Sequence, residues 1–298
     1  MVQEIERVEQ LKPETMDRDY TRQGKPVIIT RMAEEWPALK KWSPSYFRKV
    51  CGNEEVLIRG SRVGYRLIGW VKLGEYIDWL IDGKVKPLKS KGEHHILAPY
   101  DSSHPVKPYV AYNKSLENTL VCKDFNFEPL FPPSYRIRTT SFWIGPQGAA
   151  TPLHYDNWGV NLFFQAFGRK RFLLYPPEQS PLLYSSNVFE FTTVYSRVNL
   201  VKPDYEEFPR YRYAQPIEIT LNPGDFLLLP RCWWHDVEAL DTSISVNVWA
   251  VTKRDNYSPT YLCEKAKSFL HGVGIYAKGR CICHSINGKD LGQLLKWY

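Results

Sequence analysis

The chain has 298 residues, 43% of them hydrophobic and 14% aromatic, and an all-β barrel of this size can form one packed domain. The formal net charge is +7, but the basic residues lie in short scattered clusters, so the charge favours acidic partners only slightly and does not indicate a nucleic-acid-binding surface. No run approaches the ~18 apolar residues of a membrane-spanning helix, and the charged N-terminus lacks the apolar segment of a secretory signal. We therefore expect a cytoplasmic protein with no membrane partner.

The N-terminal part predicts short strands and helices. The apolar run Pro26–Thr30 predicts a buried strand. Ser43 followed by Pro44 is typical of a helix start, with the serine at the cap and the proline in the first turn. Apolar residues recur at helical spacing over Leu73–Ile81, which predicts an amphipathic helix. The stretch Lys84–Pro108 is rich in Lys, His, Ser and Pro, so we expect a long loop there.

The middle of the chain has the pattern of an antiparallel β protein. Short apolar or alternating runs recur, and turns rich in Gly, Pro and Asp separate them. This pattern predicts a barrel or a sandwich. The runs are Thr140–Ile144, Val160–Phe167, Arg171–Tyr175, Ile217–Leu221, Phe226–Leu229 and Ser243–Val251.

The C-terminal part predicts two helices, over Ser258–Leu270 and Asp290–Trp297. Their apolar side chains suit either a homodimer interface or a cap on the barrel; they are Leu262, Phe269, Leu294, Leu295 and Trp297. We expect one catalytic domain over residues 1–298. It would comprise an N-terminal α/β elaboration (1–138), a barrel core (about 139–252) and a C-terminal helical extension (253–298).

Two clusters of cysteine and histidine residues do not indicate a metal site. The six cysteines are scattered and show no disulfide framework. Cys281, Cys283 and His284 lack a fourth ligand and the usual Cys-x-x-Cys spacing of a zinc site. The pair His94-His95 lies in the predicted loop and does not by itself form a metal site. We expect reduced thiols at the first cluster and solvated imidazoles at the second.

A third set of residues indicates a metal centre. His154 and Asp156 are two residues apart, so on an extended chain both side chains point to the same side. This pair alone is a weak signal, because it can arise by chance. His235 strengthens it, since we expect the buried strand Phe226–Leu229 to deliver this histidine to the mouth of the barrel. Two histidines and one carboxylate form a facial triad, which leaves open positions on iron(II).

The motifs around these residues, taken together, resemble the JmjC (cupin-like) hydroxylase family over about residues 20–252. The resemblance implies a mainly β fold, the double-stranded β-helix or jelly roll, with flanking N- and C-terminal helices. It also implies Fe(II), 2-oxoglutarate as co-substrate, and O2. One departure is local: Asn161 lies seven residues after His154, one more than in an asparaginyl hydroxylase of this family. The matching stretches are Thr151–Asp156, Phe163–Gln165, Gly168–Arg171, Leu174–Pro177, Asn199–Pro209, Pro223–Asp225, Pro230, Trp233–His235 and Ser245–Asn247.

The resemblance also implies a site for 2-oxoglutarate. Lys170 matches the cation that binds the distal carboxylate, and Thr151 matches a hydroxyl donor to the same group. Tyr109 matches a tyrosine that reaches this carboxylate, with Tyr112 as a possible substitute. Two further polar positions, Asn161 and Asn247, match residues that line the metal cavity. Ser243–Trp249 alternates polar and apolar residues, so we expect Ser245 and Asn247 to face the barrel interior together.

The implied reaction is hydroxylation of a C–H bond, with succinate and CO2 as co-products. A protein or peptide side chain is the substrate that the resemblance favours. N-methyl-lysine demethylation and hydroxylation of a tRNA base or a small metabolite are alternatives within the family. A non-catalytic cupin-like binding protein is a further alternative, which the complete set of motif residues disfavours. Four aromatic residues are candidates for either the cleft or the core: Tyr155, Trp158, Trp233 and Trp234.

Overall fold

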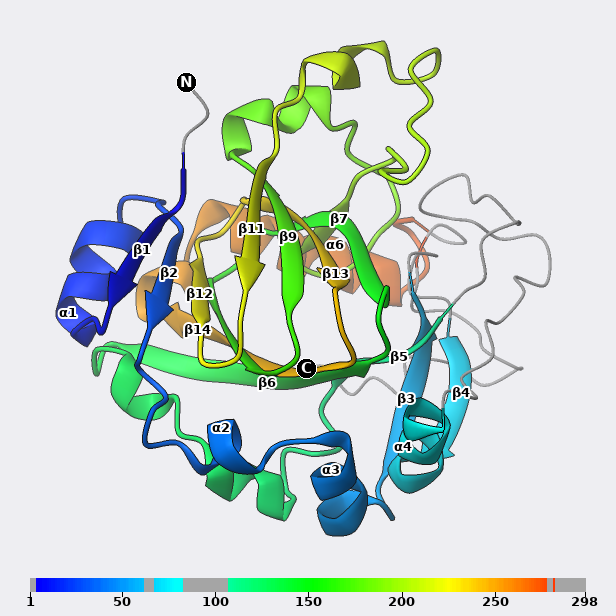
Figure 1. The fold of residues 1–298 in the computed structure, drawn as a ribbon. Helices are drawn as coiled ribbons and strands as arrows, with labels where there is room; N and C mark the ends of the chain where they lie inside the picture. Colours follow the sequence, from blue (N-terminus) through cyan, green and yellow to red (C-terminus); the bar gives the residue numbers. More distant parts are fainter. Residues whose placement is uncertain (1–3, 62–66, 83–106, 278–280, 282–298) are drawn as a thin grey trace.

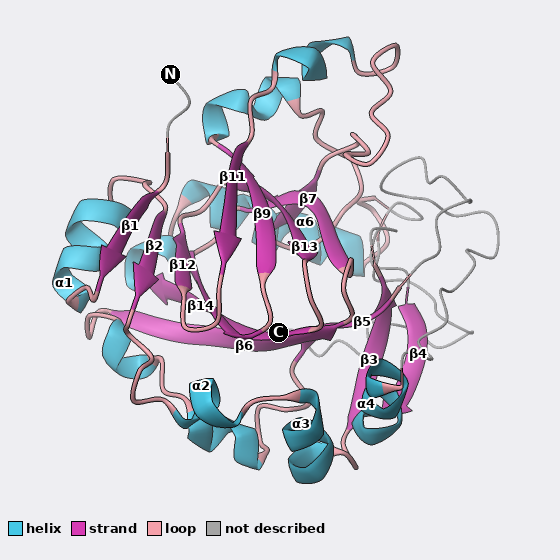
Figure 2. Ribbon diagram, viewed as in Figure 1, coloured by secondary structure: helices cyan, strands magenta, loops and turns pink. Residues whose placement is uncertain are grey.

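The computed structural model describes residues 4–61, 67–82, 107–277 and 281 (Figure 1). The histidine pair at 94–95, the second C-terminal helix and two members of the cysteine cluster, Cys283 and His284, lie outside these residues. Strands dominate the fold, with helices around them (Figure 2). The strands are β1 (Glu6–Glu9), β2 (Val27–Thr30), β3 (Glu55–Gly60), β4 (Leu67–Lys72), β5 (Pro108–Asn113), β6 (Tyr135–Gly145), β7 (Ala150–Asp156), β8 (Val160–Phe167), β9 (Lys170–Tyr175), β10 (Thr193–Tyr195), β11 (Ile217–Leu221), β12 (Phe226–Leu229), β13 (Trp234–Ala239) and β14 (Ser243–Thr252).

The strands form two sheets. The larger sheet has nine strands in the order β1-β2-β12-β8-β14-β6-β5-β3-β4, and the smaller has five in the order β10-β7-β13-β9-β11. From β6 to β9 and again from β11 to β14, the chain crosses between the sheets, and the pairs within the barrel are antiparallel. This is the jelly-roll arrangement, so the predicted fold class is confirmed. Strands from the first 113 residues complete the large sheet at both ends.

Side-chain alternation in the large sheet separates two cores. On β8, Phe164 packs in the core outside the barrel, whereas its neighbour Phe163 packs in the core between the sheets. On β14, Val246 and Val248 face outward, and Asn247 between them faces the barrel interior. Both faces of these strands are buried, and the inward face of β14 carries polar residues, Ser245 and Asn247. Full burial of one such phenylalanine stabilises the fold by about 1.5–3 kcal/mol.

Helices cover the outer face of the large sheet (Figure 1). The predicted helix over Leu73–Ile81 is confirmed with the same bounds, as α4. The capped start is also confirmed, because the Ser43 hydroxyl accepts a hydrogen bond from the amide of Tyr46 at 3.2 Å. The helices are α1 (Pro13–Thr15), α2 (Pro37–Lys41), α3 (Pro44–Cys51), α4, α5 (Lys253–Asn256) and α6 (Pro259–Gly272), with a π-helical segment at Met16–Thr21 and 3-10 segments at Leu120–Asp124, Glu128–Leu130, Pro177–Leu182 and Pro209–Tyr213.

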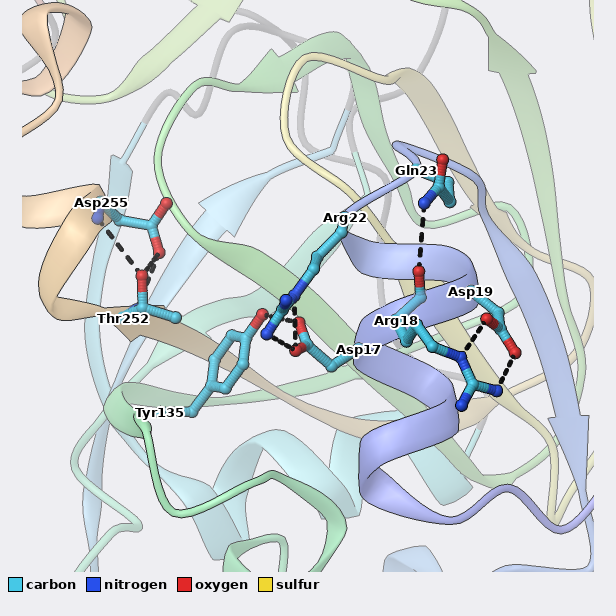
Figure 3. A network of polar contacts seen from close by, with 8 residues as sticks. All are labelled: Asp17, Arg18, Asp19, Arg22, Gln23, Tyr135, Thr252 and Asp255. Atoms are coloured by element: carbon cyan, nitrogen blue, oxygen red, sulfur yellow. Dashed lines mark hydrogen bonds and ion pairs between the residues drawn. The ribbon is translucent and has the colours of Figure 1, made fainter.

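A polar network fastens the N-terminal helical segment to the barrel (Figure 3). The buried carboxylate of Asp17 accepts a hydrogen bond from the Tyr135 hydroxyl at 2.6 Å and pairs with Arg22 at 2.7 Å. Burial, followed by the contact with Asp17, raises the pKa of Tyr135, which therefore remains a donor. Nearby, Thr252 and Asp255 form a capping box that turns the end of β14 into α5. The barrel thus holds its flanking helices at defined places.

One expectation about the barrel is wrong. His235 is not delivered by the strand Phe226–Leu229, because it lies on the next strand, β13. The chain reverses between the two strands at Cys232, whose φ is 69°. The chain thereby passes from β12 in the large sheet to β13 in the small sheet, where β13 pairs with β7. Among the described helices, none is long and apolar enough to cross a membrane.

Candidate active site

Three buried side chains from two adjacent strands converge at one end of the barrel. His154 and Asp156 lie on β7, and His235 lies directly opposite His154 on β13. One ligand atom from each residue lies within 4.8 Å of the others, and the two imidazole centroids are 4.0 Å apart. Alternate residues of β7 share a face, which is why both of its ligand candidates point to the same place. The arrangement can accommodate one metal ion.

Backbone carbonyls orient both imidazoles. His154 Nδ1 lies 2.8 Å from the carbonyl oxygen of Pro152, and His235 Nδ1 lies 3.0 Å from that of Trp233. A carbonyl only accepts, so each Nδ1 carries the proton and each Nε2 keeps a lone pair for a metal. Burial lowers the pKa of both histidines, and this favours the neutral form that binds metals.

The carboxylate of Asp156 is also held from two sides. Thr193 on β10 donates its hydroxyl to Oδ1 at 3.1 Å, and the Trp249 indole N–H donates to Oδ2 at 3.0 Å. Each carboxylate oxygen has a further lone pair, so these bonds leave Asp156 able to bind a metal. Contacts of this kind orient a ligand and typically change metal affinity when they are removed. The donor set therefore fits a divalent transition metal.

A pocket opens from these residues into the barrel and encloses about 420 Å³ of empty space, part of it open to solvent. Its wall combines the two histidines with polar groups and a larger apolar and aromatic surface. Such a composition suits a small ligand that is fixed by a few polar contacts. The lining residues are Tyr109, Tyr112, Trp143, Thr151, His154, Asn161, Phe163, Lys170, Phe172, Leu227, Leu229, His235, Val237, Asn247 and Trp249.

The ammonium of Lys170 lies inside this pocket. Its side chain is 1% exposed and donates hydrogen bonds to the hydroxyls of Tyr109 at 3.1 Å and Ser245 at 2.6 Å. Among the described residues, no carboxylate forms an ion pair with it. Burial lowers the pKa of Lys170 to about 7. The neighbours Arg169 and Arg171 point outward to ion pairs with Asp241 and Glu238, as their alternation predicts.

Tyr109 and Thr151 both line the pocket. Burial raises the pKa of Tyr109, while a hydrogen bond with the Thr151 hydroxyl opposes this rise. Gly145 makes room for the tyrosine ring, because a Cβ at this position would lie 2.6 Å from ring atom Cδ2. The structure therefore brings Lys170, Tyr109 and Thr151 together around one region of the pocket. Tyr112 lines the pocket as well, stacked on Trp249 with centroids 5.2 Å apart.

The two asparagines line the pocket and bond to one another. Asn247 donates to Asn161 Oδ1 at 2.7 Å and accepts from the Trp143 indole N–H at 2.6 Å. Part of their hydrogen-bonding capacity is thus used within the protein. Ser245 and Asn247 both face the interior, as the alternation on β14 predicts.

The aromatic candidates for the cleft lie elsewhere. Trp234 and Tyr155 pack against one another in a separate core, and the Trp233 indole N–H donates to the carbonyl of Gly24. Trp158 stacks on Tyr261 of α6 at 4.7 Å. The tryptophans that line the pocket are Trp143 and Trp249, which the sequence interpretation missed. Alternation could have identified Trp249, because it lies two residues after Asn247 on the same strand.

The fold and the pocket define a cupin-like protein. The family model of the cupin-like domain matches residues 85–255, more than half of the chain, and the chain belongs to this JmjC-type family. The resemblance of the motifs is thereby confirmed. Membership and the His–Asp–His cluster support a 2-oxoglutarate-type oxygenase at the level of the family, and they fit Fe(II) and 2-oxoglutarate in general.

Individual relatives belong to two named groups. HSPB1-associated protein 1 of Rattus norvegicus is 31% identical over 271 residues, which are 86% of this chain and 55% of the relative. The homolog of that protein in Danio rerio is 33% identical and covers 82% of this chain and 56% of the relative. Lysine-specific demethylase 8 of Xenopus tropicalis is 29% identical, and the match covers 77% of this chain and 49% of the relative. The chain spans about half the length of the curated relatives it matches.

Proposed function

We propose that this chain is an Fe(II)- and 2-oxoglutarate-dependent dioxygenase that hydroxylates a C–H bond of a protein or peptide side chain. Succinate and CO2 are the co-products of this reaction. The observation that carries the proposal is the buried ammonium of Lys170, which lies in one pocket with the two histidines of the triad and forms no ion pair with a described carboxylate.

Lys170 has hydrogen-bond acceptors, but its charge requires a counter-ion that the described part of the protein does not supply. Moving an ammonium out of water without a counter-ion costs several kcal/mol, so such a group is retained where a ligand compensates it. A dicarboxylate fits: one carboxylate would meet Lys170, Tyr109 and Thr151, and the 2-oxo acid end would reach the triad. A cupin that used no such co-substrate would leave this cluster of donors without a common purpose.

The triad supplies the other half of the proposal. His154, Asp156 and His235 would hold the iron through two Nε2 atoms and one carboxylate oxygen, and three protein ligands leave open positions for co-substrate and dioxygen. Bound iron with 2-oxoglutarate supplies the oxygen chemistry that protein side chains lack. The protein orients the ligands, holds the co-substrate and excludes water with the apolar wall formed by Leu227, Leu229 and Val237.

We also propose that the flanking regions and the barrel form one catalytic unit. Tyr109, which contacts Lys170, comes from β5 and therefore from the N-terminal part. Strands β2 and β5 are hydrogen-bonded to barrel strands β12 and β6. The pocket is consequently incomplete without residues that precede the barrel.

The names of the relatives support a protein substrate, since one group is named for association with a protein and the other for lysine demethylation. Demethylation of an N-methyl-lysine remains the second candidate because three relatives are named as demethylases or as JmjC proteins. Mass spectrometry of treated peptides separates the two reactions. Hydroxylation adds one oxygen atom, whereas demethylation removes a methyl group and releases formaldehyde.

The direct test is iron-dependent formation of succinate from 2-oxoglutarate. We expect turnover by the wild-type protein and loss of turnover in His154→Ala and Lys170→Met. The control is Lys202→Met, which removes an exposed lysine outside the pocket. Lys170→Met should also lose 2-oxoglutarate binding while its metal binding is preserved. Absence of both turnover and 2-oxoglutarate binding in the wild-type protein would overturn the proposal.

A further inference from the structure

Tyr112, near the end of β5, combines a strained backbone with a place in the pocket wall. Its φ is 55°, in the left-handed region that a bulky side chain rarely adopts. Among the described residues that line the pocket, Tyr112 is also the only one that is not buried, so it lies at the mouth. A backbone of this kind costs free energy and persists where the surrounding structure holds it, often at functional sites.

A β-bulge turns Tyr112 toward the barrel interior. Val110 and Asn113 are three residues apart on β5, but their partners on β6 are two residues apart. Val110 packs in the outer core, whereas Ala111 and Tyr112 both pack against the core between the sheets. Strict alternation would place Tyr112 on the outer side with Val110. The extra residue of the bulge therefore brings the tyrosine ring into the pocket.

The ring of Tyr112 contacts both tryptophans of the pocket wall. It stacks on Trp249 with centroids 5.2 Å apart and 14° between the planes, and it meets Trp143 edge to face at 5.0 Å. The guanidinium carbon of the buried Arg59 lies 5.9 Å from the centroid of the same ring, a distance at which a cation is attracted to an aromatic face. Neighbours on β14, β6 and β3 thus hold the ring in one orientation.

Trp249 links Tyr112 to the metal-binding residues. Its indole N–H donates to Asp156 Oδ2 at 3.0 Å. The N–H bond of an indole lies in the plane of the ring, so a neighbour that fixes this plane also fixes the direction in which the hydrogen points. A hydrogen bond weakens steeply as it bends, and the nearly parallel Tyr112 ring opposes the tilt that would bend it.

We propose that Tyr112 is a positioning residue for the metal centre, because its bulged and strained backbone holds the ring against Trp249 and thereby keeps the indole N–H on Asp156. The inference rests on the proposed function, since it takes the triad as the metal site. It adds a residue at the mouth of the pocket that acts on the metal through two intervening side chains. The strain at Tyr112 is then the cost of placing an aromatic ring where regular alternation would not place one.

Other roles for Tyr112 make different predictions. If Tyr112 only contacted a substrate at the mouth, its replacement would alter substrate binding and leave metal affinity unchanged. If it only filled space, its replacement would change the stability of the fold but not the geometry of the bound metal. Metal affinity and the spectrum of the bound metal therefore distinguish a positioning residue from both.

The experiment measures Mn(II) affinity and the Co(II) absorption spectrum of the whole chain, without co-substrate or peptide. Tyr112→Asn removes the ring, and asparagine tolerates a left-handed backbone, so this variant is expected to keep the bulge. We expect its Kd for Mn(II) to increase by about tenfold or more and its Co(II) bands to shift, because the support of Asp156 is lost. Tyr112→Phe keeps the ring and should restore the wild-type affinity and spectrum.

The matched control is Tyr205→Asn. Tyr205 also stacks on an aromatic ring, that of Tyr211, at 6.1 Å and has the guanidinium carbon of Arg212 at 5.6 Å from its centroid. It does not line the pocket, so Tyr205→Asn should leave the Mn(II) affinity and the Co(II) spectrum unchanged.

A double variant tests the route through Trp249. In Trp249→Phe the hydrogen bond to Asp156 is already absent, so the addition of Tyr112→Asn should lower Mn(II) affinity no further. Two independent contributions would instead add in the double variant.

Each contrary outcome is specific. Unchanged Mn(II) affinity in Tyr112→Asn, an equal loss in Tyr205→Asn, or additive losses in the double variant would each overturn the inference. A loss in Tyr112→Phe as large as that in Tyr112→Asn would also overturn it, because the hydroxyl and not the ring would then be responsible. Failure of the proposed function looks different: the wild-type protein would form no succinate with iron, while the effect of Tyr112 on Mn(II) affinity would remain.

Discussion

His154 and His235 face each other across β7 and β13, with their ring centroids 4.0 Å apart and each Nδ1 beside a backbone carbonyl. Two buried neutral imidazoles this close gain little from one another. A cation between their Nε2 atoms would be stabilised by both lone pairs, so we expect the two residues to act as metal ligands.

Metal binding should stabilise the fold through these two residues. A ligand present at a hundredfold excess over its Kd stabilises the native state by about 2.7 kcal/mol, so Mn(II) should raise the Tm of the wild-type protein. His235→Ala should abolish this rise. The control is His271→Ala, since His271 is also buried and also has Nδ1 beside a carbonyl, that of Tyr276, but lies outside the triad. An equal metal-induced shift in His235→Ala would contradict the assignment.

The affinity for 2-oxoglutarate should depend on pH through Lys170. In the ligand-free protein its pKa is lowered to about 7 by burial, whereas a bound carboxylate would raise that pKa again. Binding therefore requires uptake of a proton above pH 7, and the Kd should increase by up to about tenfold per pH unit between pH 7 and 9. Calorimetry in buffers of different ionisation enthalpy measures the proton uptake directly. A Kd independent of pH over this range would show that Lys170 does not bind the carboxylate.

The hydrogen bond from Trp249 to Asp156 should tune metal affinity. Trp249→Phe keeps an aromatic ring against Tyr112 but removes the donor to Oδ2. Loss of such an outer contact typically lowers metal affinity by about 10–100-fold. Trp234→Phe is the matched control. It removes the hydrogen bond from the Trp234 indole N–H to the Ser180 hydroxyl, and neither residue lines the pocket. The two variants should differ in Mn(II) titrations, and similar affinities would argue against the role of Trp249.

Gly145 should be required for the position of Tyr109. In Gly145→Ala the new Cβ would lie 2.6 Å from the tyrosine ring and 2.9 Å from the Ala149 Cβ, so the ring must move away. We expect a loss of about 1–3 kcal/mol in the free energy of unfolding and weaker 2-oxoglutarate binding, measured by urea unfolding and calorimetry. Gly272→Ala, where no atom lies within 4 Å of the new Cβ, should cost nothing. Unchanged co-substrate binding in Gly145→Ala would exclude Tyr109 from that contact.

Local signals in the sequence predicted a large part of this protein. The cap at Ser43 and the apolar spacing over Leu73–Ile81 predict their helices correctly, because capping and helical period depend on residues a few positions apart. The residues of the triad were also identifiable from the sequence, as was the JmjC-type family to which the chain belongs. The spacing of His154 and Asp156 on one strand and the surrounding motifs are local as well.

Tertiary structure alone decided which side chains meet. It showed that His235 arrives on β13, that Trp143 and Trp249 line the pocket while Trp233 and Trp234 do not, and that Thr193 supports Asp156. In a jelly roll both faces of the central strands are buried, so an apolar run does not reveal which of its residues face the ligand. The partners of a buried charge such as Lys170 come from strands far apart in the chain, and only the packed sheets determine which of them are within reach.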